Sequence, residues 1–155
     1  MSREIVRMDW NNPYCWQVAP FIFWRMWNFT ERYDAEGTPE ETSGLARTWF
    51  TTGDKRLGLW AIVDSEAGLV GHLFANPEPI VTDPRQWRYV LVRQAEANDN
   101  IDIRHESKEV FKQVEEWTRS LGLNTLLILT HKSSEAMSRR WGFHEYKSLL
   151  KKELT

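Results

Sequence analysis

The sequence predicts an α/β fold in which a mixed sheet is flanked by helices, and three observations lead to it. Residues 20–50 contain two helical patterns, the second of which has a complete capping box. Residues 57–95 contain strand-type runs separated by turn signals. Residues 87–130 follow the order strand, helix, strand, which favours a parallel pair joined by a right-handed crossover. A chain of 155 residues with this pattern fits one domain over residues 1–155.

The N-terminal segment begins with a predicted strand at residues 3–8 and a turn at Asn11–Pro13. Pro20 suits the first turn of a helix, so the sequence predicts a helix over residues 20–33. A surface helix carries its apolar residues on one stripe, whereas here they surround most of the circumference. These residues are Phe21, Ile22, Phe23, Trp24, Met26, Trp27, Phe29 and Tyr33. We therefore expect this helix to be deeply buried or shared with a partner.

A second helix is predicted from Thr38 to about Phe50. Thr38 has the residue type of an N-cap, Pro39 suits the first turn, and Glu41 completes a T-x-x-E capping box. The run from Thr51 to Asp54 is expected to end the helix. A β-hairpin follows, with strands over residues 57–63 and 69–75.

The prolines after this hairpin, at residues 76–79 and 83–84, are expected to break the chain, and the next strand spans residues 87–95. A helix then begins near Glu106 or Ser107, or as early as Arg104, and ends at Gly122. The continuous apolar run at residues 123–130 predicts a strand that is buried on both faces. The last predicted elements are a short helix capped by Ser133 or Ser134 and ending at Trp141-Gly142, and a strand from Phe143 to Leu150.

Composition excludes several classes of protein. The net charge of −2 argues against a dedicated nucleic-acid partner. No run of about 18 apolar residues is present, and the first residues are too charged for a secretory signal, so we expect no membrane association. A single cysteine, Cys15, allows no intrachain disulfide, and the cytoplasm is the expected location.

Motifs for metal, triad and nucleotide chemistry are missing from the sequence. The four histidines show no ligand spacing and no cysteine pair exists, so no metal site is predicted. Neither a G-x-S-x-G elbow nor a Walker A or G-x-G-x-x-G loop is present. The four histidines are His72, His105, His131 and His144.

The last third of the chain resembles a known family. A strand is followed by a short helix with Ala136 near its start, then by Trp141-Gly142-Phe143 and a final strand. This is similar to the closing half of the GNAT (GCN5-related N-acetyltransferase) family. The predicted element order, β-α-α-β-β-β-α-β-α-β, is also that of the family, so the resemblance implies the GNAT-like acyl-CoA N-acyltransferase fold.

The resemblance implies acetyl-CoA as cofactor, lying in a gap between the fourth and fifth strands. Its pantetheine arm would pair with the fourth strand, and its pyrophosphate would lie on the N-terminus of the next helix. Residues 104–108 are the implied cofactor-binding segment, with Arg104, His105, Ser107 and Lys108 near the phosphates, and Arg139 reaching the cofactor from the other side. Ser107 and Glu109 stand where the family has glycines, and Glu109 brings negative charge toward a dianion.

The implied catalytic residues are Glu96, Ser138 and His131. Glu96, near the end of the fourth strand, would be the general base for an amine, with a solvated strand-end carboxylate as the bland interpretation. Ser138 stands where the family has the tyrosine that acts as general acid, and a serine hydroxyl is a poorer proton donor than a tyrosine hydroxyl. His131, at a strand end, is the next candidate donor.

Two classes of function follow. One is an N-acetyltransferase acting on a small-molecule or protein amine. The other is a catalytically inactive GNAT-fold protein used for assembly or binding, as in some phage internal or virion proteins, and its expected location would then be within a virion. The aromatic first helix favours a homo-oligomer or a protein partner, with Trp24 and Trp27 as the expected interface anchors.

Overall fold

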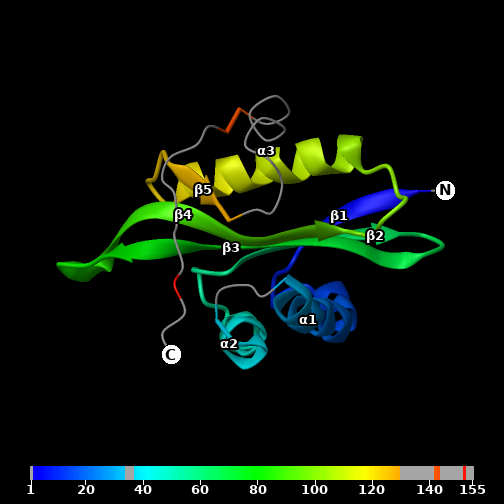
Figure 1. The fold of residues 1–155 in the computed structure, drawn as a ribbon, viewed down its shortest axis with the longest axis horizontal. Coiled ribbons are helices and arrows are strands. Elements are labelled where there is room, and N and C mark those ends of the chain that lie inside the picture. The colour runs from blue at the N-terminus through cyan, green and yellow to red at the C-terminus, as the bar shows by residue number, and fades with distance from the viewer. Residues whose placement is uncertain (1, 34–36, 130–141, 144–151, 153–155) are drawn as a thin grey trace.

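The computed structural model describes residues 2–33, 37–129, 142–143 and 152 (Figure 1). The order of its eight elements agrees with the first eight predicted from the sequence. The predicted helix from Ser133 or Ser134 and the last strand lie largely outside the described residues. The elements are β1 (Arg3–Arg7), α1 (Pro13–Tyr33), α2 (Pro39–Thr52), β2 (Gly58–Asp64), β3 (Gly68–Ile80), β4 (Asp83–Ala97), α3 (Arg104–Ser120) and β5 (Leu126–Ile128).

The five strands form one mixed sheet in the order β1-β2-β3-β4-β5. The first three neighbouring pairs are antiparallel, and β4 and β5 are parallel, as predicted. Helices α1 and α2 cover one face of the sheet and α3 covers the other (Figure 1). The mixed sheet flanked by helices is therefore confirmed.

Helix α1 begins at Pro13, so the predicted start at Pro20 is wrong. The Asn12 side-chain oxygen accepts the amide of Tyr14 at 3.0 Å, which caps the first turn. Pro13 then fills the first helical position, where a missing N–H costs nothing. Pro20 lies inside the helix on its exposed side, so water can reach the backbone carbonyl that its ring leaves without a donor.

Helix α2 begins as the sequence predicts. The Thr38 hydroxyl accepts the Glu41 amide at 3.2 Å, and the Thr38 amide donates to the Glu41 carboxylate at 2.9 Å. The helix ends at Gly53, which has a left-handed backbone with φ of 66°. Both ends of this helix are therefore fixed by local chemistry.

Strands β3 and β4 run through the prolines that were expected to break them. Strand β2 pairs with β3 only as far as Ala75, so at Pro77 and Pro79 the one described neighbour of β3 is β4. The amide of Val90, the partner of Pro77, donates to Thr125 on the far side of β4. The proline nitrogen of this pair therefore faces the unpaired edge, where no ladder hydrogen bond is lost.

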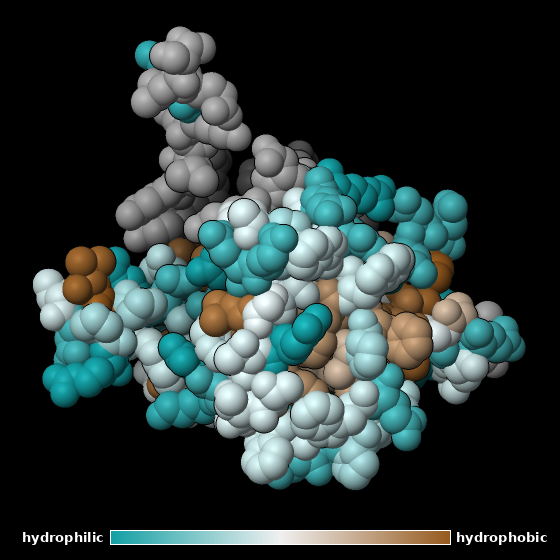
Figure 2. All heavy atoms as spheres, turned by 90° about the horizontal axis from the view of Figure 1, so that it is seen from below, coloured by the Kyte–Doolittle hydropathy of each residue, from teal (hydrophilic) through white to brown (hydrophobic). Residues whose placement is uncertain are grey.

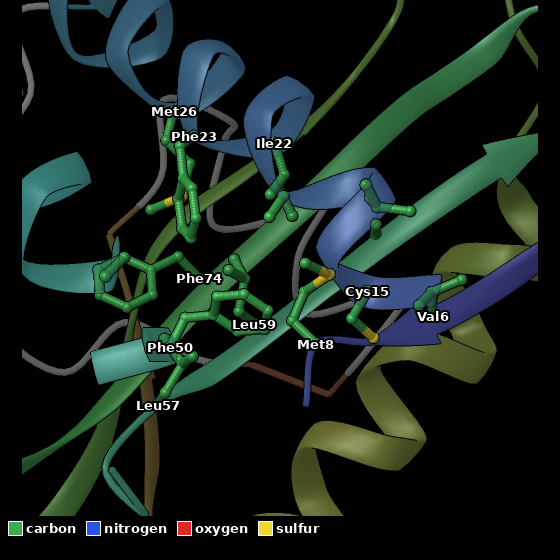
Figure 3. Close-up of a cluster of buried hydrophobic side chains, with 14 of the residues drawn as sticks. Val6, Met8, Cys15, Ile22, Phe23, Met26, Phe50, Leu57, Leu59 and Phe74 are labelled. Atoms are coloured by element: carbon green, nitrogen blue, oxygen red, sulfur yellow. The ribbon is translucent and has the colours of Figure 1, made fainter. Parts of the chain in front are cut away.

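Two hydrophobic cores lie on the two faces of the sheet. The core under α1 and α2 is drawn in Figure 3 and includes Ile22, Phe23, Phe50, Leu59 and Phe74. The core under α3 includes Trp60, Val90, Val92, Val114 and Trp117.

Strand β5 is half-buried along its length, which corrects the expectation of burial on both faces. It is the outermost strand of the described sheet, so only one of its edges is covered by a neighbouring strand. Leu126 and Ile128 still pack against the core under α3.

Candidate functional site

Strands β4 and β5 share only a short stretch of pairing. Leu126–Ile128 pairs with Val90–Val92, whereas β4 continues to Ala97. A cavity of about 680 Å³ opens beside the end of β4 that the described part of β5 does not reach. Its walls come from α1, the sheet and the start of α3, and include Phe29, Tyr33, His72, Leu73, Ala95, Glu96, Ala97, Asp102, Arg104, Ser107 and Phe111.

A β-bulge in β4 precedes the cavity. Ala75 pairs with Val92 and Phe74 pairs with Gln94, so Arg93 is the extra residue. Before the bulge, Val92 belongs to the core under α3. After it, Gln94 bonds to helix α1 on the opposite face. In a regular strand Val92 and Gln94 would lie on the same face of the sheet. The bulge therefore places the side chains of Gln94 and Glu96 on the face under α1.

This bulge leaves backbone groups at the edge of the sheet. The Asn98 amide donates to Val70 of β3 at 2.8 Å, so alternation directs the amides and carbonyls of Ala95 and Ala97 away from β3. They face the side on which β5 is not paired along the described chain. An extended ligand with amide groups can hydrogen-bond to such an edge as an added strand would.

Glu96 lies in the wall of the cavity and is paired with Arg25 of α1. The two side chains are 16% and 13% exposed, and a carboxylate oxygen lies 3.3 Å from a guanidinium nitrogen. Arg25 also donates to Asn98 at 2.7 Å and to the Val70 carbonyl at 3.3 Å. Glu96 is thus an ion-paired and mostly buried carboxylate, and it differs from the solvated strand-end carboxylate of the alternative interpretation.

Behind this pair lies a buried histidine that the sequence did not single out. The Arg25 Nε donates to Nδ1 of His72 at 3.1 Å, so the other ring nitrogen carries the proton and donates to the Gln94 carbonyl oxygen at 2.8 Å. The Gln94 amide in turn donates to Thr30 at 3.1 Å. Burial, with the neighbouring charge of Arg25, lowers the pKa of His72 to about 4. His72 is therefore neutral at physiological pH and holds the guanidinium in place.

Sequence reasoning missed Arg25, His72 and Gln94. The available signal was the placement of His72 inside an otherwise apolar strand segment, because buried polar side chains are normally hydrogen-bonded. Gln94 carries no such signal, since Arg93 and Glu96 lie near it in the sequence. The link from His72 and Gln94 to Arg25 joins residues far apart in sequence.

Four of the predicted cofactor residues lie at the start of α3, where the side chains of Arg104 and Ser107 already make hydrogen bonds within the protein. Arg104 and Ser107 line the cavity, whereas His105 and Lys108 are exposed. The Ser107 amide donates to the Ile103 carbonyl at 2.7 Å, and its hydroxyl donates to Arg104 at 3.2 Å.

A carboxylate occupies the start of this helix. An Asp102 oxygen accepts a hydrogen bond from the Arg104 amide at 3.1 Å. The Arg104 guanidinium also donates to both oxygens of this carboxylate, at 3.0 and 2.8 Å. These bonds hold the pKa of Asp102 below its usual range. The edge of β4 and the cavity suit the thioester arm of acetyl-CoA, but the helix start as it stands does not suit a diphosphate, because a negative charge is already bound there.

The remaining predicted residues are placed in part. His131, Ser138 and Arg139 lie outside the described residues. Phe143 of the Gly-Phe pair is described, and its ring lies 5.8 Å from that of Phe111 on α3.

The described residues contain neither a helix that could span a membrane nor a cluster that could hold a metal ion. No described helix is long and apolar enough to cross a membrane. Over the same residues, no cluster of three or more His, Cys, Asp or Glu side chains is arranged to hold a metal ion.

Trp24 and Trp27, the predicted interface anchors, lie on the side of α1 that faces away from the pair of Arg25 and Glu96. Trp24 is 71% exposed, while Trp27 is half-buried and donates its indole N–H to Glu31 at 2.7 Å. Both line a groove of about 460 Å³ between α1 and α2, on the side seen in Figure 2, where brown apolar side chains lie among teal polar ones.

No protein-family model matches the chain, and no curated protein matches it. Solved structures do. The chain is similar to a predicted acetyltransferase with acetyl-CoA from Clostridium acetobutylicum, with a TM-score of 0.68 and 7% identity over 98% of this chain and 96% of that one. It is similar to a GCN5-related N-acetyltransferase from Ralstonia eutropha, with a TM-score of 0.65 and 11% identity over 98% and 99%.

A third similar structure is AAC(6')-Iy in complex with a bisubstrate analog, CoA-S-monomethyl-acetylneamine. Its TM-score is 0.66 and its identity is 13%, over 100% of this chain and 99% of that one. These likenesses show that the chain has the GNAT fold, as the sequence resemblance implied.

Proposed function

We propose that the protein is an N-acetyltransferase that moves an acetyl group from a thioester donor to an amine. The observation that carries this proposal is the held carboxylate of Glu96 in the wall of a cavity beside the unpaired edge of β4. The GNAT fold supports the reaction class, and fold alone is an analogy, so the argument rests on the site.

The reaction needs one bond formed and one broken. The amine nitrogen attacks the thioester carbonyl carbon, a C–N bond forms, and the C–S bond breaks. The attacking nitrogen loses a proton and the leaving thiolate gains one. Such a transfer depends chiefly on placement and on a base that accepts the amine proton, directly or through one water.

We assign the base to Glu96 and its orientation to Arg25. The guanidinium fixes one carboxylate oxygen, which leaves the other for the amine. Asn98 and His72 hold the guanidinium from two further sides. Arg25 and His72 are therefore positioning residues in this proposal.

We assign the donor arm to the edge at Ala95 and Ala97. Their small side chains line the cavity and leave room beside the backbone. Arg104, His105, Ser107, Lys108 and Arg139 stay the residues that the family resemblance places near the nucleotide of the donor. His131 stays a predicted proton donor for the thiolate, and Ser138, at the position of the family's tyrosine, stays the predicted poorer donor.

Thiol release from acetyl-CoA in the presence of a panel of amines tests this function. We expect Glu96→Gln, which keeps an acceptor for Arg25 but removes the base, to lower kcat/KM by about 100-fold or more. Asp99→Asn is the matched control, because it neutralises a neighbouring carboxylate in the same cavity wall and should retain most activity.

The pH profile separates a base from a structural role. The rising limb of kcat/KM against pH should disappear in Glu96→Gln if Glu96 is the base. Full activity with an unchanged profile in this variant would contradict the assignment.

A second candidate function is binding of a partner through the exposed aromatic side chains of α1. Phe21 and Trp24 are 65% and 71% exposed, and Trp10 and Trp16 are also exposed. Large exposed aromatic residues that lie close together mark interaction sites. We propose a homo-oligomer as the occupant, with a protein partner as the alternative.

A further inference from the structure

We propose that the donor is recognised by its pantetheine thioester arm and not by its nucleotide, so that the substrate class is acyl-pantetheine thioesters in general. This inference rests on the proposed function and names the donor for the same site. Three observations carry it: two concern the start of α3 and its adjoining loop, and the third concerns the edge of β4.

The first observation is that the first amide of α3 and the nearest cation are already engaged by a carboxylate. A helix start attracts anions because its first amides have no acceptor within the helix. Here the carboxylate of Asp102 accepts the Arg104 amide and also pairs with the Arg104 side chain. A phosphate that bound the Arg104 amide or the Arg104 guanidinium would have to displace this carboxylate from both.

The second observation is the charge and composition of the adjoining loop. Residues 98–109 contain four carboxylates, two Lys or Arg residues and no glycine. The carboxylate of Glu106, in the first turn, already has Arg3 of β1 as its partner at 3.5 Å. Asp99 and Asp102 are likewise paired, with Arg32 and Arg104. A doubly charged diphosphate would therefore find no surplus of positive charge here and a backbone with side chains at every position.

The third observation is that the other end of the cavity does suit an uncharged arm. Ala95 and Ala97 present backbone amide groups at the open edge of β4, and Leu73 and Phe111 supply apolar contact. Pantetheine has two amides and no charge, so it can pair with this edge as an added strand does. The site therefore holds the features needed for the arm and opposes those of the nucleotide.

The experiment compares S-acetylpantetheine with acetyl-CoA as donors, and pantetheine with CoA as ligands in calorimetry. We expect kcat/KM and affinity for the two donors to agree within about fivefold. We expect Asp102→Ala, which frees the helix start, to increase affinity for CoA by about fivefold or more and to leave pantetheine affinity unchanged. Asp99→Asn is the control for charge, because Asp99 lines the cavity but makes no bond to α3.

The outcomes distinguish a failure of this inference from a failure of the proposed function. A preference of the wild-type protein for CoA over pantetheine by more than about fivefold, or no gain in CoA affinity in a folded Asp102→Ala variant, would overturn the inference and leave the proposed function standing. Absence of binding and turnover with both donors would overturn the proposed function itself. A circular dichroism spectrum like that of the wild type shows that the variant is folded.

Discussion

At the scale of single residues, Gly53 shows how one position satisfies two requirements. Its backbone is left-handed, and a Cβ placed there would lie 2.2 Å from the indole nitrogen of Trp10. Gly53→Ala should therefore lower the free energy of unfolding by about 1–3 kcal/mol, through backbone strain and displacement of the ring. Denaturant titration measures this loss.

Gly44 is the matched control for this substitution. It lies inside α2, and a Cβ there meets nothing within 4 Å. Gly44→Ala should raise the free energy of unfolding by about 0.5–1 kcal/mol, because alanine loses less backbone entropy in a helix. Equal effects of the two substitutions would contradict this account of Gly53.

His72 makes stability depend on pH. Its pKa is about 4 in the folded protein and about 6.5 when unfolded, so the unfolded chain binds more protons between these values. The free energy of unfolding should fall on the order of 3 kcal/mol as pH drops from 6.5 to 4, because protonation favours the unfolded state. Thermal or denaturant unfolding across this range measures the slope.

His72→Gln is the variant that isolates this effect. It removes the titrating ring and should flatten the dependence between pH 4 and 6.5, even though it lowers stability overall. Asp64 does not contribute to the slope in this range. Its pKa is about 2 in the folded protein, so the stability that its ionised form provides is lost only below pH 4. An unchanged slope in His72→Gln would show that another group is responsible.

At the scale of elements, helix α1 has a buried face and an aromatic outer face. Trp24→Ala should change the free energy of unfolding by less than about 0.5 kcal/mol, because the ring is mostly exposed, but should reduce the oligomer mass in light scattering. Phe23→Ala, on the buried face, should cost about 3–5 kcal/mol instead. A wild-type protein that stays monomeric at high concentration would contradict the proposed homo-oligomer.

Elements were predictable where their signals are local. The capping box of α2 lies within four residues, and the structure confirms it. Prolines misled the prediction at Pro20 and at residues 76–79, because the cost of a missing N–H depends on which side the nitrogen faces. That side is set by neighbouring elements, so sequence alone cannot supply it.

At the scale of the whole molecule, the fold was predicted and the site only in part. The order of the elements and the parallel pair followed from periodicity, and Glu96 followed from the family resemblance. Its partner Arg25 lies on the first helix, and His72 lies on another strand. Such contacts arise from the assembly of sheet and helix, so no short motif encodes them.

The bulge at Arg93 has a consequence for how the chain tolerates change. Because Arg93 is the extra residue, its deletion would let Val92 and Gln94 alternate regularly, and Gln94 and Glu96 would stay on the face under α1. Deletion of Ala95 would instead move Glu96 to the face under α3, and the partner of Arg25 would be lost. The position of a deletion in β4 therefore decides whether the carboxylate stays in the site.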